Sequence, residues 1–320
     1  TYLDKAERLS RLAPAVAGLL GLDGTVTPAA AEQAARLCKA DLLTKVVFEF
    51  PELQGVMGGI YARADAVDDA VPAAIRDHYK PEGPSDDLPE TPAGMLLAVC
   101  DKMDTLTCFF AKDRRPAGGS DPFGLRRACL GVLRIVLEIG RPARLSRIVE
   151  IVYPLVPAPA LPLERTTEDI LEFVKGRLEI LWKDVASPDI LEAALACGVD
   201  DPVTARRRLE ALAEFQGSDE FEDLSVAFKR AYRIVRDEGW TSCDVDASLL
   251  QQDEERALVD ALSSIEDRVA AAIAEGDFGS SFSEFRKLRT PIDRFFSKVY
   301  VNVDDPKVRG NSLQLLARVG

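Results

Sequence analysis

The sequence predicts an all-α fold. Apolar residues recur at helical spacing in one segment after another. Helix-start signals such as Thr27-Pro28 and Asp121-Pro122 stand directly before several of these segments. No run of four or more residues alternates apolar and polar side chains between hairpin turns. We therefore expect few strands or none.

The first long helix is expected to begin at Thr27-Pro28, because this pair supplies an N-cap followed by proline at the first helical position. Cys38, Leu42, Val46 and Phe50 then recur every four residues, which predicts one continuous helix face. Pro51 is expected to end that helix. Asp121-Pro122 begins another, whose inward residues are predicted to be Leu125, Cys129, Val132, Leu133 and Val136.

The later helices show the same signals. Thr166–Asp169 has the pattern of a capping box before an apolar series from Ile170 to Leu181. Ser187-Pro188 and Asp201-Pro202 begin two more helices, and the glycines expected to end them are Gly198 and Gly217. The last three helices are predicted over 258–275, over 285–299 and from Asp305-Pro306 onward, with Gly276 ending the first.

A proline-rich segment predicts a domain boundary. Residues 156–162 contain three prolines, which exclude a helix and favour a semi-rigid extended chain. We therefore place a domain boundary there, after residue 155.

Composition places the chain among ordinary globular proteins, with 47% apolar and 29% charged residues. No apolar run reaches the roughly 18 residues that a membrane span requires, and the N-terminus has no signal-peptide core. The six cysteines form no C-x-x-C pair, so we expect small buried thiols in a reducing cytoplasm.

Catalytic and metal-binding patterns are missing. His78 is the single histidine, whereas histidine-based metal sites need two or more, so we expect it to be a surface or loop-anchoring side chain. Residues 54–59 lack the G-K-[ST] ending of a P-loop, and their glycines are expected to permit a turn or close helix packing. The sequence therefore predicts no catalytic residue, no metal site and no ATP site.

Charge is unevenly distributed. The net charge of −13 argues by itself against nucleic-acid binding. Residues 281–320 nevertheless hold eight bases against four acids, and residues 121–150 hold six arginines against three acids. Such local basic surfaces suit contacts with phosphate, and neighbouring aromatic rings could stack on unpaired bases. The same pattern has a second interpretation without nucleic acid, in which the charges form a solvated helix face and the phenylalanines belong to the core.

Several segments resemble one family. Residues 38–44 (C-K-A-D-L-L-T) and 49–58 (E-F-P-E-L-Q-G-V-M-G) resemble the K-A-D-L-x-T and E-F-x-E-L-Q-G-x-M-G signature of the β subunit of bacterial glycyl-tRNA synthetase. Residues 98–106 (A-V-C-D-K-M-D-T-L) resemble its A-D-K-x-D-T-L, and residues 121–128 (D-P-F-G-L-R-R-A) its D-P-F-A-L-R-R-A. Residues 288–299 (L-R-T-P-I-D-R-F-F-S-K-V) resemble L-R-x-P-I-D-x-F-F-D-x-V.

The resemblance implies a helical HD-like domain over residues 1–155, whose metal site this chain cannot assemble. Linker and body helices over 156–222 and a helical anticodon-binding domain of the DALR type over 223–320 would follow. It implies that the partners are tRNA(Gly) and an α subunit, in an α2β2 assembly or a fused chain. The α subunit would use ATP and Mg²⁺ to activate glycine, so we expect no cofactor here. The residues expected to bind tRNA are Arg126, Arg127, Arg134, Lys229, Arg230, Arg286, Lys287, Arg289, Lys298, Arg309 and Asn311.

Three positions depart from the family pattern. Ser312 stands where the family usually has arginine, Ser120 where lysine is common, and Phe228 where a polar residue precedes Lys229-Arg230. Each departure removes a possible RNA contact. Two other functions remain open: a non-catalytic helical scaffold, and an HD-type hydrolase, against which the missing histidines argue.

Overall fold

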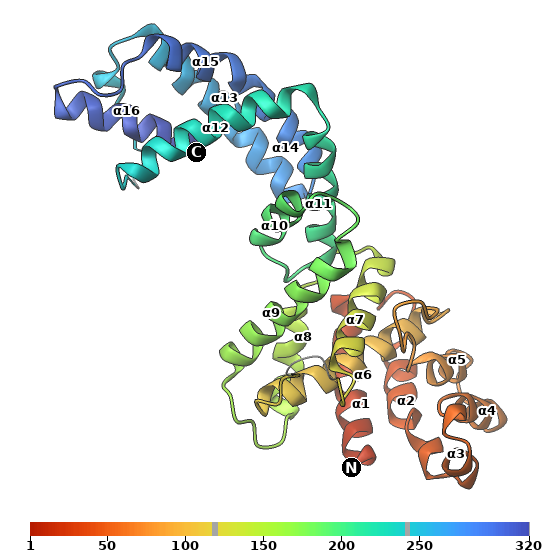
Figure 1. The fold of residues 1–320 in the computed structure, drawn as a ribbon. Helices are drawn as coiled ribbons and strands as arrows, with labels where there is room; N and C mark the ends of the chain where they lie inside the picture. Colours follow the sequence, from red (N-terminus) through yellow and green to blue (C-terminus); the bar gives the residue numbers. More distant parts are fainter. Residues whose placement is uncertain (117–120, 241–243, 320) are drawn as a thin grey trace. The chain divides into compact units, whose positions relative to one another are not determined.

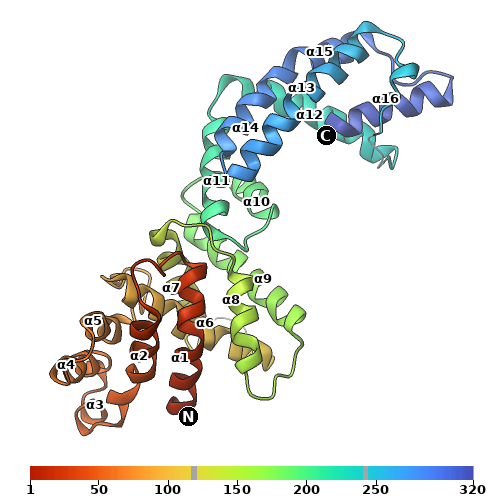
Figure 2. The same cartoon turned by 180° about the vertical axis from the view of Figure 1, so that it is seen from behind.

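The computed structural model describes residues 1–116, 121–240 and 244–319. All regular structure in these ranges is helical, which confirms the predicted all-α class (Figures 1 and 2). The chain forms two compact units. Unit 1 comprises Thr1–Asp184 and Leu191–Arg206, and unit 2 comprises Val185–Ile190 and Arg207–Gly320. Within the described ranges, no helix combines the length and apolarity that crossing a bilayer requires.

Unit 1 is built around one buried helix. Helix α6 (Pro92–Ala111) packs against α1, α2, α5, α7, α8 and α9 (Figure 1). Thr91 caps it by accepting a hydrogen bond from the backbone N–H of Gly94. The helices of this unit are α1 (Tyr2–Leu19), α2 (Pro28–Leu37), α3 (Lys45–Glu49), α4 (Val56–Ala64), α5 (Ala70–Asp77), α6, α7 (Leu125–Ile139), α8 (Leu145–Val152) and α9 (Leu163–Trp182). Helices α10 (Pro188–Ala196) and α11 (Pro202–Gln216) contribute residues to both units.

Local helix signals are confirmed at several starts. The Thr27 side chain accepts from the backbone N–H of Ala30 at 3.2 Å, and α10 and α11 begin at Pro188 and Pro202 as predicted. The start predicted at Asp121-Pro122 is wrong, because α7 begins at Leu125, although the Asp121 carboxylate accepts from the backbone N–H of Arg126 at 3.0 Å. The predicted inward residues of α7 are all buried. The capping box at Thr166 is wrong, because α9 already begins at Leu163 and Thr166 donates to the Pro162 carbonyl inside the helix.

The continuous helix predicted up to Pro51 is also wrong. Helix α2 ends at Leu37, a 3-10 turn covers Ala40–Leu43, and Thr44 caps the separate short helix α3. Cys38 is buried, but Val46 and Phe50 are 37% and 55% exposed, so the predicted residues do not share one inward face. The Asp41 carboxylate explains the break, because it turns inward and accepts from the backbone N–H groups of Gly55 and Gly58.

The glycines of residues 54–59 permit a turn and close helix packing, as predicted. Gly55 has φ of +78°, and a Cβ there would lie 2.9 Å from the Arg76 carbonyl oxygen. A Cβ at Gly59 would lie 2.7 Å from the Pro72 carbonyl oxygen. Helix α4 therefore packs backbone-close against α5.

The proline-rich segment 156–162 is not helical and lies within unit 1. The backbone N–H groups of Ala160 and Leu161 donate to the Ala111 carbonyl, and the Tyr153 hydroxyl donates to the Leu161 carbonyl. These bonds attach the segment to the end of α6. The division into 1–155, 156–222 and 223–320 stays a prediction.

Unit 2 contains α12 (Asp219–Asp237), α13 (Asp253–Glu275), α14 (Phe278–Phe285), α15 (Arg289–Lys298) and α16 (Pro306–Val319), with a 3-10 turn η5 (Arg286–Leu288) between α14 and α15. The single helix predicted over 285–299 is thus divided at η5. Gly276 ends α13 at φ of +74°, and Asp305 begins α16 by accepting from the Lys307 N–H, both as predicted.

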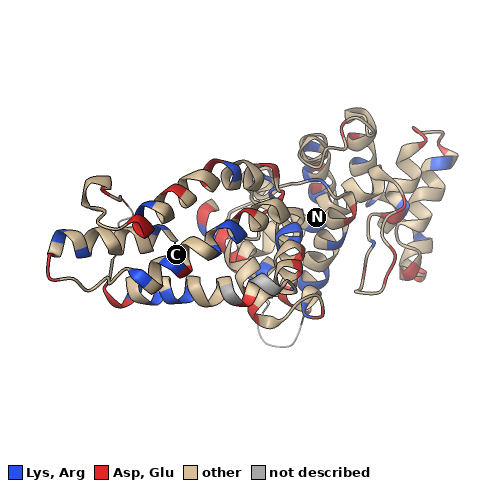
Figure 3. Cartoon of the chain, turned by 90° about the horizontal axis from the view of Figure 1, so that it is seen from above, with Lys and Arg blue, Asp and Glu red and all other residues tan. Residues whose placement is uncertain are grey.

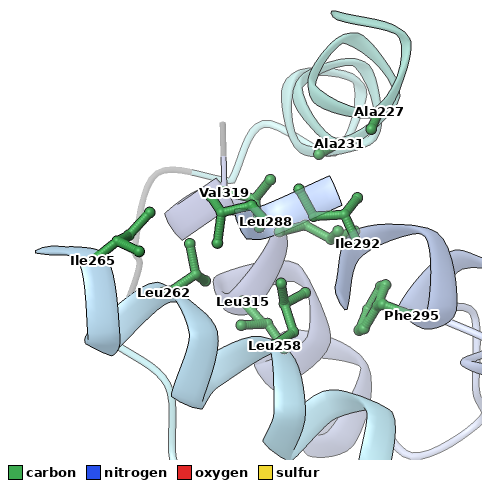
Figure 4. Close-up of a cluster of buried hydrophobic side chains, with 11 residues drawn as sticks. Ala227, Ala231, Leu258, Leu262, Ile265, Leu288, Ile292, Phe295, Leu315 and Val319 are labelled. Carbon is green, nitrogen blue, oxygen red and sulfur yellow. The ribbon is translucent and has the colours of Figure 1, made fainter. Parts of the chain in front are cut away.

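The core of unit 2 fixes which face of α12 points outward. Ala227 and Ala231 face a buried cluster that includes Leu258, Ile292 and Phe295 (Figure 4). Burial of a leucine, isoleucine or phenylalanine side chain of this cluster contributes about 1.5–3 kcal/mol to stability. Because the alanines at i and i+4, with Phe228 beside them, pack against this cluster, Lys229, Arg230 and Arg233 are left on the exposed side of α12.

Candidate nucleic-acid interface

Helix α12 carries an exposed basic and aromatic surface. Lys229, Arg230 and Arg233 are exposed, and the Tyr232 side chain is 56% exposed. The Arg230 guanidinium lies 4.2 Å from the centre of the Phe296 ring, which fixes its position through a cation–π contact. Among the described residues, no hydrogen bond or ion pair occupies the Lys229 ammonium. We call Lys229, Arg230, Tyr232 and Arg233 the α12 surface.

Part of the basic segment 281–320 lies next to α12. Turn η5, which contains Arg286 and Lys287, contacts α12. Both side chains are exposed, but the Lys287 ammonium donates to the Glu284 carboxylate at 2.7 Å. The positive charge of Lys287 is therefore partly neutralised by Glu284 at the end of α14, whereas Arg286 is exposed beside it. Arg289 and Lys298 are exposed on α15.

Two predicted contact residues of unit 2 have structural partners. Asn311 is 2% exposed, and its side-chain amide accepts from the Asp246 N–H at 2.7 Å and donates to the Asp246 carbonyl. Burial leaves Asn311 no surface to offer an RNA. Arg309 is half-buried and pairs with Glu238 at 2.6 Å. Lys and Arg are interspersed with Asp and Glu along the helices (Figure 3), so neighbouring acids reduce the charge of many basic positions.

The basic residues of α7 in unit 1 differ from one another. Arg127 is exposed, and Arg126 is half-buried. Arg134 is also half-buried, and its guanidinium donates to the carbonyl oxygens of Gly83 and Asp86 at 3.0 and 2.8 Å. Arg134 thus binds the polar loop before α6, and this structural role explains the arginine without any contact to RNA.

The K-A-D and D-K-x-D-T-L motifs of unit 1 form a buried ionic cluster. The Lys39 ammonium is 2.8 Å from His78 Nε2 and 3.0 Å from Asp101 Oδ1. Lys5 also approaches Asp101 Oδ1, at 3.1 Å, and Arg8 donates to both oxygens of Asp104. These motif residues hold the helices of unit 1 together and do not form an RNA-facing surface.

Burial and charge explain the titration of this cluster. His78 is fully buried, so the surface alternative is wrong, and its Nδ1 lies 2.6 Å from the Ile75 carbonyl oxygen. Burial, together with the Lys39 ammonium, lowers the pKa of His78 to about 3. Burial alone would raise the pKa of Asp101, but Lys5 and Lys39 outweigh it and hold that pKa well below its usual range. Burial likewise lowers the pKa of Lys102 to about 8, although its ammonium donates to the carbonyls of residues 78, 79 and 80.

A metal ion of the HD type does not fit this cluster. His78 and Asp101 are ligand types that such an ion would use, but the Lys39 ammonium already lies against both. Within the described ranges, no three His, Cys, Asp or Glu side chains gather as a metal-binding group. Both the HD-like fold of unit 1 and its metal-free state stay predictions.

The thiols divide by position. Cys38, Cys100 and Cys129 are buried as predicted, and burial raises the pKa of Cys38 and of Cys129 to about 12. Cys108 is half-buried and Cys197 is exposed, which corrects the expectation of burial for these two. Cys243 lies outside the described residues, as does the departure at Ser120.

Comparison with known proteins identifies the family. The family model described as glycyl-tRNA synthetase beta subunit matches residues 1–196, which is more than half of the chain. The chain belongs to the glycyl-tRNA synthetase β subunit family. A second model, described as DALR anticodon binding domain, matches residues 224–320. This match covers most of α12 and all of α13 to α16, and it includes the α12 surface.

Curated relatives of this family extend the match over the whole chain. The chain is 43% identical to the glycine–tRNA ligase beta subunit of Rhodospirillum centenum over 100% of its own length and 45% of that protein. It is 40% identical to the subunit of Anaeromyxobacter dehalogenans, covering 99% of this chain and 46% of the relative. For Myxococcus xanthus the identity is 39%, with 100% and 46% covered. The chain therefore spans about half the length of these relatives.

Two of the three departures from the family pattern, Ser312 and Phe228, pack within unit 2. Ser312 is 2% exposed and donates to the buried Glu255 carboxylate, so this departure lies inside unit 2 and not on an RNA-facing surface. Phe228 is half-buried and packs edge-on against Phe285 at 6.2 Å between ring centres. Sequence reasoning missed Phe215 of α11, whose ring stacks on Phe282 at 5.2 Å, because no local signal connects two residues so distant in the chain.

Proposed function

We propose that this chain is the tRNA-recognition portion of the β subunit of a glycine–tRNA ligase. The α12 surface carries this proposal, because it presents cations and an aromatic ring on the outward face of a helix within the anticodon-binding match. Cations neutralise phosphates whatever the sequence, and aromatic rings stack on unpaired bases. Both features suit a tRNA loop.

The ligation chemistry is assigned to a different subunit in this proposal. The curated relatives are named beta subunits of glycine–tRNA ligase, and the sequence offers no P-loop or histidine-based centre for activating glycine. The α subunit, separate or fused, would bind ATP and Mg²⁺ and form glycyl-tRNA(Gly). This chain would contribute affinity and orientation for the tRNA in the cytoplasm.

Salt-dependent tRNA binding by the full-length ligase tests the proposal. The variant Lys229→Ala/Arg233→Ala removes two exposed charges of the α12 surface. For every phosphate that the variant no longer neutralises, the slope of log K against log salt should become shallower by roughly 0.7 to 0.9. Lys183→Ala, at a residue 69% exposed in unit 1, is the matched control and should leave the slope unchanged.

A helical scaffold without an RNA role predicts a different result. The double variant would then bind tRNA(Gly) with the affinity and salt slope of the parent while its circular dichroism stayed unchanged. That outcome would remove the α12 surface from the interface and contradict the proposal.

A further inference from the structure

A cavity with aromatic walls opens on the surface of unit 2. Its volume is about 420 Å³, which lies within the range of small-ligand sites. The walls come from α11, α12, α14 and α16. The lining residues are Phe215, Phe228, Lys229, Tyr232, Phe282, Phe285 and Val319. We call this the aromatic cavity.

The rings of the aromatic cavity hold one another in place. Phe215 and Phe282 stack nearly parallel, with 5.2 Å between ring centres and 5° between ring planes. Phe228 and Phe285 meet edge to face and also pack against the apolar core beneath. All four phenylalanines remain half-buried and not fully covered. The walls are thus fixed before any ligand enters.

The aromatic cavity carries a positive charge at Lys229. Lys229 is the one charged side chain among the described lining residues. Arg233 is exposed next to Tyr232 in the chain, and the Arg236 guanidinium lies 6.0 Å from the centre of the Tyr232 ring but pairs with the Asp237 carboxylate at 2.9 Å. An apolar protein side chain would gain little from these cations. A nucleotide would use both features, because its base is a flat ring and its phosphate is an anion.

We propose that the aromatic cavity takes one unpaired base of a tRNA loop, which stacks on Tyr232 while Lys229 faces its phosphate. This inference rests on the proposed function and adds the nucleotide-binding site to it. Stacking tolerates every base, since each has a π face. The cavity therefore distinguishes an unpaired nucleotide from a paired one and contributes little to the choice between bases.

Substitution of Tyr232 in the full-length ligase tests the site. Tyr232 is 56% exposed, so Tyr232→Ala should leave the fold intact. We expect this variant to bind tRNA(Gly) about 5- to 100-fold more weakly, with an unchanged salt slope. Tyr232→Phe keeps the ring and should bind within about twofold of the parent. Tyr300→Ala, at a tyrosine 73% exposed elsewhere in unit 2, is the matched control and should have no effect.

A set of tRNAs with one abasic nucleotide at each anticodon-loop position identifies the stacked base. One abasic tRNA should bind the parent enzyme weakly, and Tyr232→Ala should weaken it no further, because the two changes remove the same interaction. An equal additional loss for every abasic tRNA would overturn the proposal, as would parental affinity of Tyr232→Ala for intact tRNA. If Tyr232→Ala weakened subunit association and not tRNA binding, the occupant would be a protein side chain and the proposal would be wrong.

The salt dependence separates this inference from the proposed function. A reduced slope in Lys229→Ala/Arg233→Ala, with parental binding by Tyr232→Ala, would keep the α12 surface as the interface and reject the base-stacking site. Parental slopes and affinities in both variants would reject the proposed function itself.

Discussion

Mild acid should destabilise unit 1 through a single residue. His78 Nδ1 is 2.6 Å from the Ile75 carbonyl and Nε2 is 2.8 Å from the Lys39 ammonium. The carbonyl requires a donor and the ammonium requires an acceptor, so together they fix the neutral ring with its proton on Nδ1. A second proton would place an N–H group directly against the Lys39 ammonium.

The size of the effect follows from linkage. The pKa of His78 falls from 6.5 to about 3 on folding, so the unfolded chain binds the proton more tightly. Its contribution to stability is complete above pH 6.5 and is lost as the pH falls, at about 1.4 kcal/mol per pH unit. Between pH 7 and pH 5 the free energy of unfolding of unit 1 should fall by about 2 kcal/mol.

Urea denaturation at the two pH values measures this loss. The chain has two tryptophans, Trp182 buried in unit 1 and Trp240 in unit 2. Trp240→Phe leaves Trp182 as the reporter, so that its fluorescence follows unit 1 alone. His78 is the single histidine, and the carboxylates with lowered pKa titrate below about pH 4. Lys102, with a pKa of about 8, stays mostly protonated up to pH 7, so His78 supplies nearly all of the change from side chains with a resolved shift.

The control is His78→Gln, which carries an amide acceptor and does not titrate. Its free energy of unfolding should be nearly the same at pH 7 and pH 5. Equal stability of the parent protein at both values would refute the reasoning. So would an undiminished pH dependence in His78→Gln.

Three further outcomes are expected. Lys39→Met should lower the free energy of unfolding by about 3 kcal/mol, the low end for a broken buried pair, because Asp101 keeps Lys5 at 3.1 Å. A decrease below about 1 kcal/mol in urea denaturation would contradict the assignment. Gly55→Ala should cost about 2 kcal/mol or more, because φ is +78° and the new Cβ meets the Arg76 carbonyl; an unchanged thermal midpoint would argue against it. The chain alone should show no glycine-dependent ATP–pyrophosphate exchange, and exchange that persists through purification would overturn the division between subunits.

Helix boundaries that depend on neighbouring residues could be predicted from the sequence. Thr27 and Asp305 bind backbone groups within three residues of themselves, so their side chains indicate the helix start directly. Gly276 ends α13 because a left-handed φ is inexpensive only for glycine. These features need no knowledge of the rest of the chain.

Features that depend on distant partners could not be predicted. The periodicity of residues 38–50 favours a helix, but Asp41 binds the start of α4 and Lys39 binds a histidine 39 positions away. Asn311 is polar and therefore resembles a residue of an RNA surface, whereas its partner is the backbone of Asp246. The aromatic cavity needs Phe215, which tertiary packing alone brings to Phe282.

The Lys39 ammonium is a cation that the chain supplies to itself. A bound ion exchanges with its surroundings, and its occupancy follows the free concentration outside. A side-chain ammonium is tethered by covalent bonds, so the charge that balances Asp101 is present in every folded molecule. Each folded chain therefore carries one Lys39 ammonium at this position. We therefore expect that chelators and fluctuations in metal supply do not act on this part of the folding equilibrium.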